Sequence, residues 1–158
     1  MTGVQLRALG PLLGSILLLG GALAFQYLSG LAPCHLCILQ RWPHGIAIAL
    51  GLLVLVWPRP GLAVLAGLVV LVGAGIAGYH VGVEQAWWQG PTTCTAPEPG
   101  SLAAGELLDQ ILETPLVLCD QVAWSLWGIS MAGWNAILSL GIAWLWFRAA
   151  YASSSASQ

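Results

Sequence analysis

The residues best suited to chemistry gather in one short stretch, 33–44, which reads PCHLCILQRWPH. Two residues separate Cys34 from Cys37, and an apolar run typical of a helix follows the pair. At the start of a helix, free backbone N–H groups and the helix dipole stabilise a thiolate, and the intervening His35 adds to this effect. Such a disulfide is easily reduced, so the sequence predicts a fairly oxidising, exchangeable pair rather than a structural disulfide.

Arg41 and His44 follow this cysteine pair along the same predicted helix. Arg41 lies four residues after Cys37, so on a helix the two side chains share a face, and His44 lies roughly on the same side. A guanidinium in this position can stabilise a thiolate or hydrogen-bond an oxygen-bearing ligand. The alternative is that Arg41 only reaches toward lipid phosphates. Because an ionisable group inside an apolar span is costly, we favour a functional role.

The other two cysteines, Cys94 and Cys119, lie in the one long polar stretch of the chain. Joined as a structural disulfide, they would stabilise the fold by about 3 kcal/mol through loop entropy. As a redox pair they would form a relay that faces the solvent. Their spacing alone leaves both readings open.

The elements that must position these cysteines are apolar. Hydrophobic residues make up 58% of the 158 residues and charged residues only 6%, whereas a soluble domain carries about a quarter charged residues. An integral membrane protein is therefore expected. Nucleic-acid binding is excluded, because four arginines and no lysine cannot form a basic patch.

Four apolar stretches are long enough to cross a bilayer, which takes about 20 residues. They cover roughly 8–28, 37–57, 62–80 and 130–147. The sequence PRPG at 58–61 separates the second from the third with a tight turn. We therefore expect an all-α fold, an integral membrane four-helix bundle that forms a single domain over residues 1–158.

A long loop, 81–129, connects the third and fourth spans. Within it, residues 101–113 have the pattern of a short amphipathic helix that Ser101 can cap. Such a helix lies on the membrane surface or packs within the loop, and the pattern does not distinguish the two.

The arginines predict how the spans are oriented. Arg7, Arg59 and Arg148 all fall on one side of a four-span bundle, and the positive-inside rule makes that side cytoplasmic. Both termini are then cytoplasmic, and all four cysteines are periplasmic, where disulfides persist. Cleavage of the first stretch as a signal peptide is an alternative that would leave the remaining topology unchanged.

Tryptophans lie near both ends of the predicted spans, which agrees with the predicted positions of the membrane interfaces. Trp57, Trp144 and Trp146 fall near the predicted inner interface. Aromatic belts of this kind mark the level of the lipid headgroups, so we expect these three side chains at the interface.

His80 lies at the outer end of the third span, at a depth similar to that of Arg41. It can hydrogen-bond a ligand held between spans two and three, or it can pair with Glu84 one turn later. The small residues GAGIAG at 73–78 make this span thin, which favours close packing of helices.

Three motifs together resemble a known family. These are CHLCILQR at 34–41, GYHVGVEQ at 78–85 followed by Cys94, and CDQVAWSLWGISMAGWN at 119–135. The chain resembles the disulfide-bond formation protein B (DsbB) family of bacterial inner-membrane thiol oxidases over nearly its whole length. The resemblance implies that the protein reoxidises a periplasmic DsbA-like thioredoxin-fold oxidase and passes two electrons to a membrane quinone, ubiquinone or menaquinone. Protein disulfide-bond formation and folding would be sustained in this way.

The resemblance also implies an order for the cysteines. Cys94 would be attacked by the reduced partner to give a mixed disulfide, and Cys119 would be its mate. Cys119 would then pair transiently with Cys34. Cys37 would be released as the thiolate that faces the quinone.

The expected cofactor-binding residues are Arg41, His80 and His44. Arg41 would hold the quinone or stabilise the thiolate, and its charge can offset negative charge that develops on a quinone oxygen. His80 matches a histidine near the family's quinone site.

Two rival interpretations give the same residues other roles. Cys34, His35, Cys37 and His44 have the ligand types of a zinc site, but zinc would leave the distal cysteines and Arg41 without roles, so no metal is expected. A small four-span protein with two structural disulfides and no redox turnover would leave Arg41 unexplained.

Overall fold

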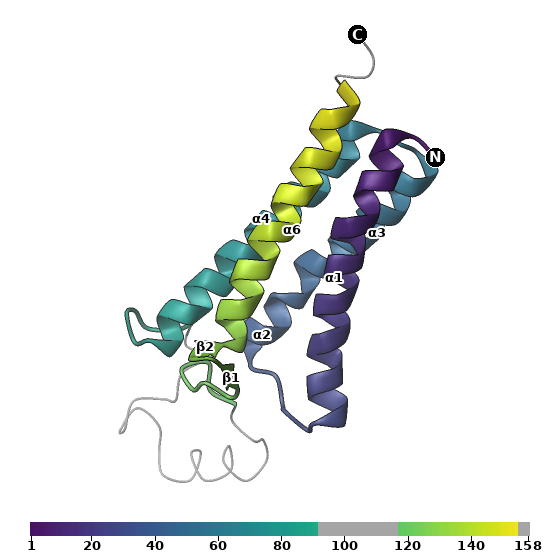
Figure 1. Cartoon of the computed structure of the whole chain (residues 1–158). Coiled ribbons are helices and arrows are strands. Elements are labelled where there is room, and N and C mark those ends of the chain that lie inside the picture. The colour runs from purple at the N-terminus through teal and green to yellow at the C-terminus, as the bar shows by residue number, and fades with distance from the viewer. Residues whose placement is uncertain (92–116, 155–158) are drawn as a thin grey trace, which may run out of the picture.

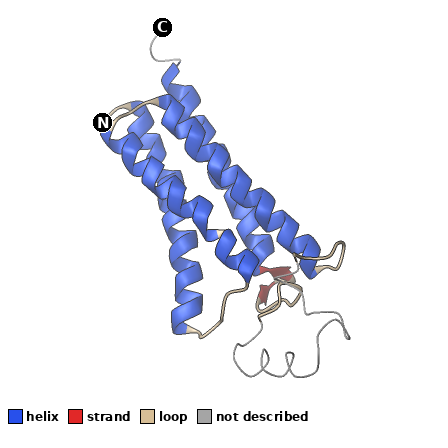
Figure 2. Ribbon diagram, turned by 180° about the vertical axis from the view of Figure 1, so that it is seen from behind, coloured by secondary structure: helices blue, strands red, loops and turns tan. Residues whose placement is uncertain are grey.

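The structure, a computed structural model, describes residues 1–91 and 117–154 and consists mainly of helices (Figure 1). The long helices are α1 (Gly3–Leu28), α3 (Arg41–Val56), α4 (Pro60–Glu84) and α6 (Met131–Ser154), and a short helix α2 (His35–Leu39) precedes α3. The four long helices run side by side as a bundle, and the only strands in the described ranges form a small hairpin at one end (Figure 2). The predicted all-α bundle is confirmed.

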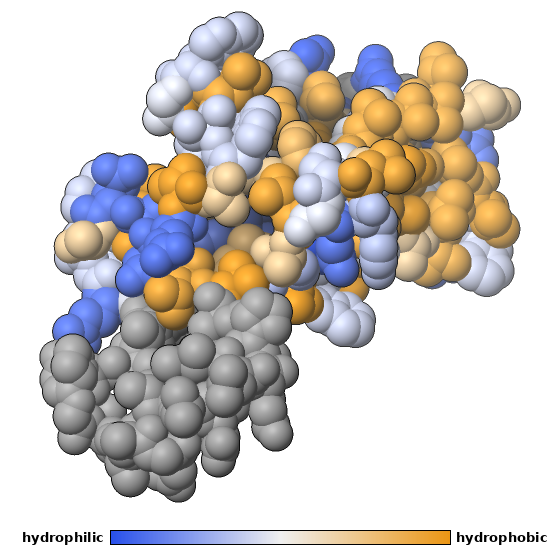
Figure 3. All heavy atoms as spheres, turned by 90° about the horizontal axis from the view of Figure 1, so that it is seen from below, coloured by the Kyte–Doolittle hydropathy of each residue, from blue (hydrophilic) through white to orange (hydrophobic). Residues whose placement is uncertain are grey.

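Within the described part of the chain, three helical segments are long and apolar enough to cross a membrane. They are Gly3–Leu28, His35–Val56 and Pro60–Glu84. Large apolar side chains such as Leu17, Val72 and Leu140 are exposed on the outside of the bundle, and hydrophobic residues cover much of the face in Figure 3. Outward-facing apolar side chains suit a lipid environment.

The helix ends follow from local chemistry. Thr2 caps α1: its side chain accepts a hydrogen bond from the N–H of Gln5, whose side chain in turn accepts one from the N–H of Thr2 at 2.6 Å. Pro60 occupies the first turn of α4, where a missing N–H costs nothing. The helices therefore extend beyond most of the predicted apolar stretches. The predicted amphipathic helix at 101–113 lies outside the described residues.

The break between α2 and α3 has a cause in the sequence. Pro43 has no N–H to donate to the carbonyl of Leu39, so the regular helical ladder is interrupted at this turn. Gln40 lies at the break with helical dihedral angles. The chain therefore continues from α2 into α3 with little change in direction, and Cys34, Arg41 and His44 stay on connected helical turns.

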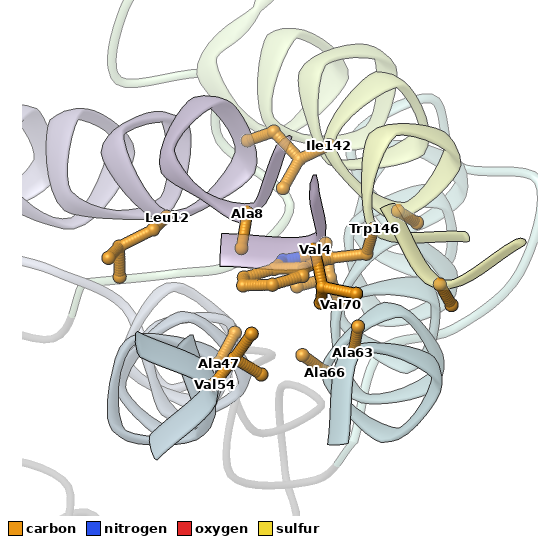
Figure 4. Packing of buried hydrophobic residues seen from close by; sticks show 12 residues of the cluster. Val4, Ala8, Leu12, Ala47, Val54, Ala63, Ala66, Val70, Ile142 and Trp146 are labelled. Carbon is orange, nitrogen blue, oxygen red and sulfur yellow. The ribbon is translucent and has the colours of Figure 1, made fainter. Parts of the chain in front are cut away.

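Small residues allow the helices to pack closely. Ala8, Ala47, Ala63 and Ala66 are fully buried where the helices meet (Figure 4). Trp146 fills the space between them with 0% of its side chain exposed. The prediction that Trp146 lies at the membrane interface is therefore wrong, because the bundle closes around its ring. Trp57 and Trp144 are exposed, as interfacial residues are.

A β-hairpin that the sequence analysis did not predict leads into α6. Strand β1 (Ser125–Leu126) pairs antiparallel with β2 (Ile129–Ser130). Trp127 and Gly128 both have positive φ, 52° and 77°, which is the requirement of a tight type I′ turn. Ser130 then accepts a hydrogen bond from the N–H of Gly133, so the hairpin also caps α6.

We predict that Gly73→Ala destabilises the bundle by about 1–3 kcal/mol through overpacking. A Cβ at residue 73 would lie 2.9 Å from the Cβ of Pro43, whose ring is rigid. Gly75→Ala is the matched control, because a Cβ there meets nothing within 4 Å, and alanine is preferred to glycine in a helix by about 1 kcal/mol. Thermal unfolding in detergent measures both variants, and equal stabilities would contradict the close approach of α3 and α4.

Candidate active site

The cysteine pair lies at the start of α2, as the sequence predicts. Cys34 is the residue that caps this helix, and its Sγ accepts a hydrogen bond from the backbone N–H of Cys37 at 3.1 Å. Both are thiols here; Cys34 is buried and Cys37 half-buried. The sulfur of Cys34 thus takes the place of the usual capping oxygen at the start of this helix.

Cys119 lies beside Cys34. The two cysteines pack with Leu36 and Val83 in one cluster, and Cys119 is 0% exposed. His80 connects them, because its Nε2 is 3.1 Å from the carbonyl oxygen of Cys119 and 3.7 Å from Cys34 Sγ. The structure therefore brings together a cysteine of the first pair, a cysteine of the long loop and the predicted histidine. Cys94 lies outside the described residues.

Arg41 faces α1. Its Nη1 donates a hydrogen bond to Gln26 Oε1 at 2.5 Å. Its Nε is buried without a hydrogen-bond partner among the residues that the structure describes. A guanidinium in this state has donor capacity left for an oxygen-bearing ligand.

A polar network crosses the bundle between α6 and α4. Asn135 Nδ2 donates to Gln40 Oε1 at 2.7 Å, and Gln40 Nε2 lies 2.9 Å from His80 Nδ1. On its other side, Asn135 Oδ1 lies 3.2 Å from His44 Nε2 and accepts from Ser139 Oγ at 3.2 Å. Three members of this network, Gln40, Asn135 and Ser139, are not among the site residues predicted from the sequence, although polar residues inside apolar spans are a signal that could have found them.

Glu84 does not form the hydrogen bond with His80 that the sequence suggested as an alternative. Its carboxylate accepts a hydrogen bond from Ser130 Oγ, which ties the end of α4 to the start of α6. The hydrogen bonds of His80 go instead to Gln40 and the two cysteines.

A cavity of about 340 Å³ opens beside these groups. Its polar lining includes Cys37, Arg41, His44 and His80, and most of the remaining wall is apolar. A few convergent polar groups in an apolar cavity of this size are typical of a small-molecule site. The sequence led us to expect a ligand between spans two and three, whereas this cavity is also walled by residues 17–25 of α1 and 131–135 of α6.

The four residues considered as zinc ligands, Cys34, His35, Cys37 and His44, do not converge on one point. His35 is exposed, and His44 faces Asn135 and Ser139. A different group, Cys34, Cys37 and His80, has its donor atoms within 4.8 Å of one another. Three such atoms are enough for a metal site with an open position.

Comparisons with known proteins agree on one family. The family model described as "Disulfide bond formation protein DsbB" matches residues 5–149. A "Disulfide bond formation protein B" of Herminiimonas arsenicoxydans is 32% identical over an alignment of 153 positions, which covers 90% of this chain and 92% of the relative. Its counterpart in Dechloromonas aromatica (strain RCB) is 31% identical over an alignment of 140 positions, which covers 82% of each chain. No solved structure matches the chain.

We predict that Asn135→Leu lowers the free energy of unfolding by about 1–3 kcal/mol, because Gln40 Oε1 loses its donor and His44 Nε2 keeps only Ser139 Oγ as a partner. Ile137→Leu is the control two residues along α6, where the side chain is 51% exposed, and it should leave stability unchanged. Denaturation in mixed micelles measures both. A variant at residue 135 as stable as the control would show that the network contributes no net stability.

Proposed function

Because the chain belongs to the disulfide bond formation protein B family, we propose that it is a thiol:quinone oxidoreductase that reoxidises a periplasmic DsbA-like protein. The chain is a membrane protein of disulfide-bond formation and thiol oxidation. The substrate, the electron acceptor and the roles of single residues belong to the proposal. One observation carries it: Cys37 and Arg41 line the same apolar cavity, directly beside the packed pair Cys34 and Cys119.

The cavity suits the ring of a quinone. Its volume of about 340 Å³ and its largely apolar wall match a small aromatic headgroup. The buried Nε of Arg41, which lacks a partner among the described residues, matches the oxygen atoms of such a ring. Arg41, His44 and His80 would hold a quinone in this cavity, and the quinone would supply an acceptor for two electrons and two protons.

The four cysteines would exchange disulfides in a fixed order. A thiolate of the reduced partner attacks Cys94 in a Cys94–Cys119 disulfide, which forms a mixed disulfide and releases Cys119 as a thiolate. Cys119 then attacks Cys34 in a Cys34–Cys37 disulfide and releases the Cys37 thiolate into the cavity. Burial of Cys34 and Cys119 in one cluster supports this step.

Two further exchanges complete the cycle. The second thiolate of the partner displaces Cys94, so the partner leaves oxidised. Cys94 attacks Cys119, which restores their disulfide and leaves Cys34 as a thiolate. Cys34 and Cys37 then hold the two electrons taken from the partner, and their disulfide forms again when the electrons leave through Cys37.

We also propose that the chain forms one four-span domain over residues 1–158 in the bacterial inner membrane, with α6 as the fourth span. The end of the bundle that carries Arg7, Arg59 and Arg148 would face the cytoplasm with both termini. Support comes from the arrangement in Figure 1, where the N-terminus and the end of α6 lie at one end and α2 and the hairpin at the other. Cys34 and Cys119 would then lie on the periplasmic side.

Arg41→Ala should slow reduction of a short-chain quinone about 10- to 100-fold, because a charged hydrogen bond contributes about 1.5–3 kcal/mol. Disulfide exchange with a reduced thioredoxin-fold partner should remain intact. Arg59→Ala, an exposed arginine at the opposite end of the bundle, is the matched control and should reduce quinone normally. Stopped-flow absorbance follows the quinone. Equal loss of exchange and quinone reduction would count against this role of Arg41, and full turnover in Cys37→Ala would refute the proposed function itself.

The packing of Cys34 against Cys119 gives a separate prediction. In the double variant Cys37→Ala/Cys94→Ala, mild oxidation should join the two remaining cysteines rapidly, because both belong to one buried cluster. The companion variant Cys34→Ala/Cys94→Ala leaves Cys37 and Cys119 and should form its disulfide more slowly. Alkylation followed by mass spectrometry measures both rates. A faster reaction in the companion variant would assign the exchange step to Cys37.

A further inference from the structure

Gln40 has no part in the proposed electron transfer, yet it is a polar side chain only 6% exposed inside an apolar span. Its amide meets three groups. Nε2 donates to the carbonyl of Leu36 at 3.1 Å and lies 2.9 Å from His80 Nδ1, while Oε1 accepts from Asn135 Nδ2 at 2.7 Å. A buried polar group that is satisfied on every side imposes its own donor and acceptor pattern on its neighbours.

The orientation of this amide follows from the carbonyl of Leu36. A backbone carbonyl only accepts, so the Gln40 atom that faces it must be the nitrogen, and Oε1 must face the NH₂ group of Asn135. Of the two hydrogens on Nε2, one then goes to Leu36. The other points to His80 Nδ1.

His80 Nδ1 therefore accepts a hydrogen bond and carries no proton. A neutral imidazole has one N–H, so the proton of His80 lies on Nε2. This N–H donates to the carbonyl oxygen of Cys119 at 3.1 Å and lies 3.7 Å from Cys34 Sγ. We propose that Gln40 is a positioning residue that holds His80 in its Nε2–H tautomer, so that a fixed N–H faces the two cysteines.

The consequence for the reaction rests on the proposed function. Whenever Cys34 is released as a thiolate, the Nε2–H of His80 stabilises the anion as a hydrogen-bond donor. His80 does not take a proton from Cys34, because Nε2 is already protonated and Nδ1 faces the N–H of Gln40. The same N–H also holds the backbone of Cys119 beside Cys34.

The tautomer also affects the group Cys34, Cys37 and His80, whose donor atoms lie within 4.8 Å of one another. A metal ion at this group needs the lone pair of Nε2. To free this lone pair, the proton would have to leave the carbonyl of Cys119 and move to Nδ1, where it would meet the N–H of Gln40. Gln40 therefore adds to the protection of the reduced pair from metal capture.

Nitrogen-15 NMR of histidine-labelled, reduced protein in micelles tests the tautomer directly, with His80 assigned from a His80→Gln sample. The wild-type protein should show the single pattern of an Nε2-protonated ring. Asn135→Leu is the matched control, because it removes a neighbouring hydrogen bond of Gln40 and leaves the contact with His80; its pattern should match the wild type. Gln40→Leu should populate the Nδ1-protonated form. An Nδ1-protonated wild-type ring, or an unchanged pattern in Gln40→Leu, would overturn the proposal.

Zinc titration of the same three reduced proteins, with a competing chromophoric chelator, gives the second readout. Gln40→Leu adds no ligand, so its affinity for zinc should rise only through the freed Nε2, by about tenfold, the order of magnitude by which hydrogen-bonding partners of a metal ligand alter metal affinity. Equal affinities in all three proteins would contradict the protective role. Neither measurement needs a partner or a quinone, so failure here would leave the proposed function standing, and failure of quinone turnover would leave the tautomer assignment standing.

Discussion

Polar side chains inside this bundle have to satisfy one another, and the rest of the site depends on that constraint. The hydrocarbon core of a bilayer offers no water to an orphaned amide or imidazole, so buried polar groups in a span depend on partners within the protein. The network from His44 and Asn135 to Gln40 and His80 supplies such partners across the bundle, and among the described residues it leaves His44 Nδ1 without one. It ends at Cys34 and Cys119, so the bonds that hold the helices together also hold the cysteines in position.

The start of α2 adds a second constraint. Cys34 caps the helix with its sulfur, and the turn that follows carries Cys37 and Arg41 toward the cavity. Pro43 interrupts the helical ladder between α2 and α3. Gln40, which lies at this break, directs its side chain to Leu36, His80 and Asn135. Backbone chemistry at one helix end thus places the sulfur atoms, the guanidinium and the amide within a few residues of each other.

Much of this architecture could be predicted from the sequence. Runs of apolar residues identify the helices, and the spacing of Cys34, Cys37 and Arg41 shows that they share one helical end, because these are local properties of the chain. The partners of Gln40 and Asn135 could not be predicted, since they depend on which helix faces which. Trp146 was misplaced for the same reason: a tryptophan near a span end is interfacial or buried according to the neighbours that pack around it. The hairpin could not be predicted, because its turn needs a positive φ at Trp127, and tryptophan, unlike glycine or asparagine, rarely adopts a positive φ.

Burial of Cys34 also has a consequence for selectivity. Cys34 has 4% of its surface exposed and lies in one cluster with Cys119, so its sulfur is hard to reach for a small thiol dissolved in water, and exchange requires such an approach. The half-buried Cys37 is the more accessible of the two. A sulfur already packed in the cluster, such as that of Cys119, reaches Cys34 without crossing the solvent.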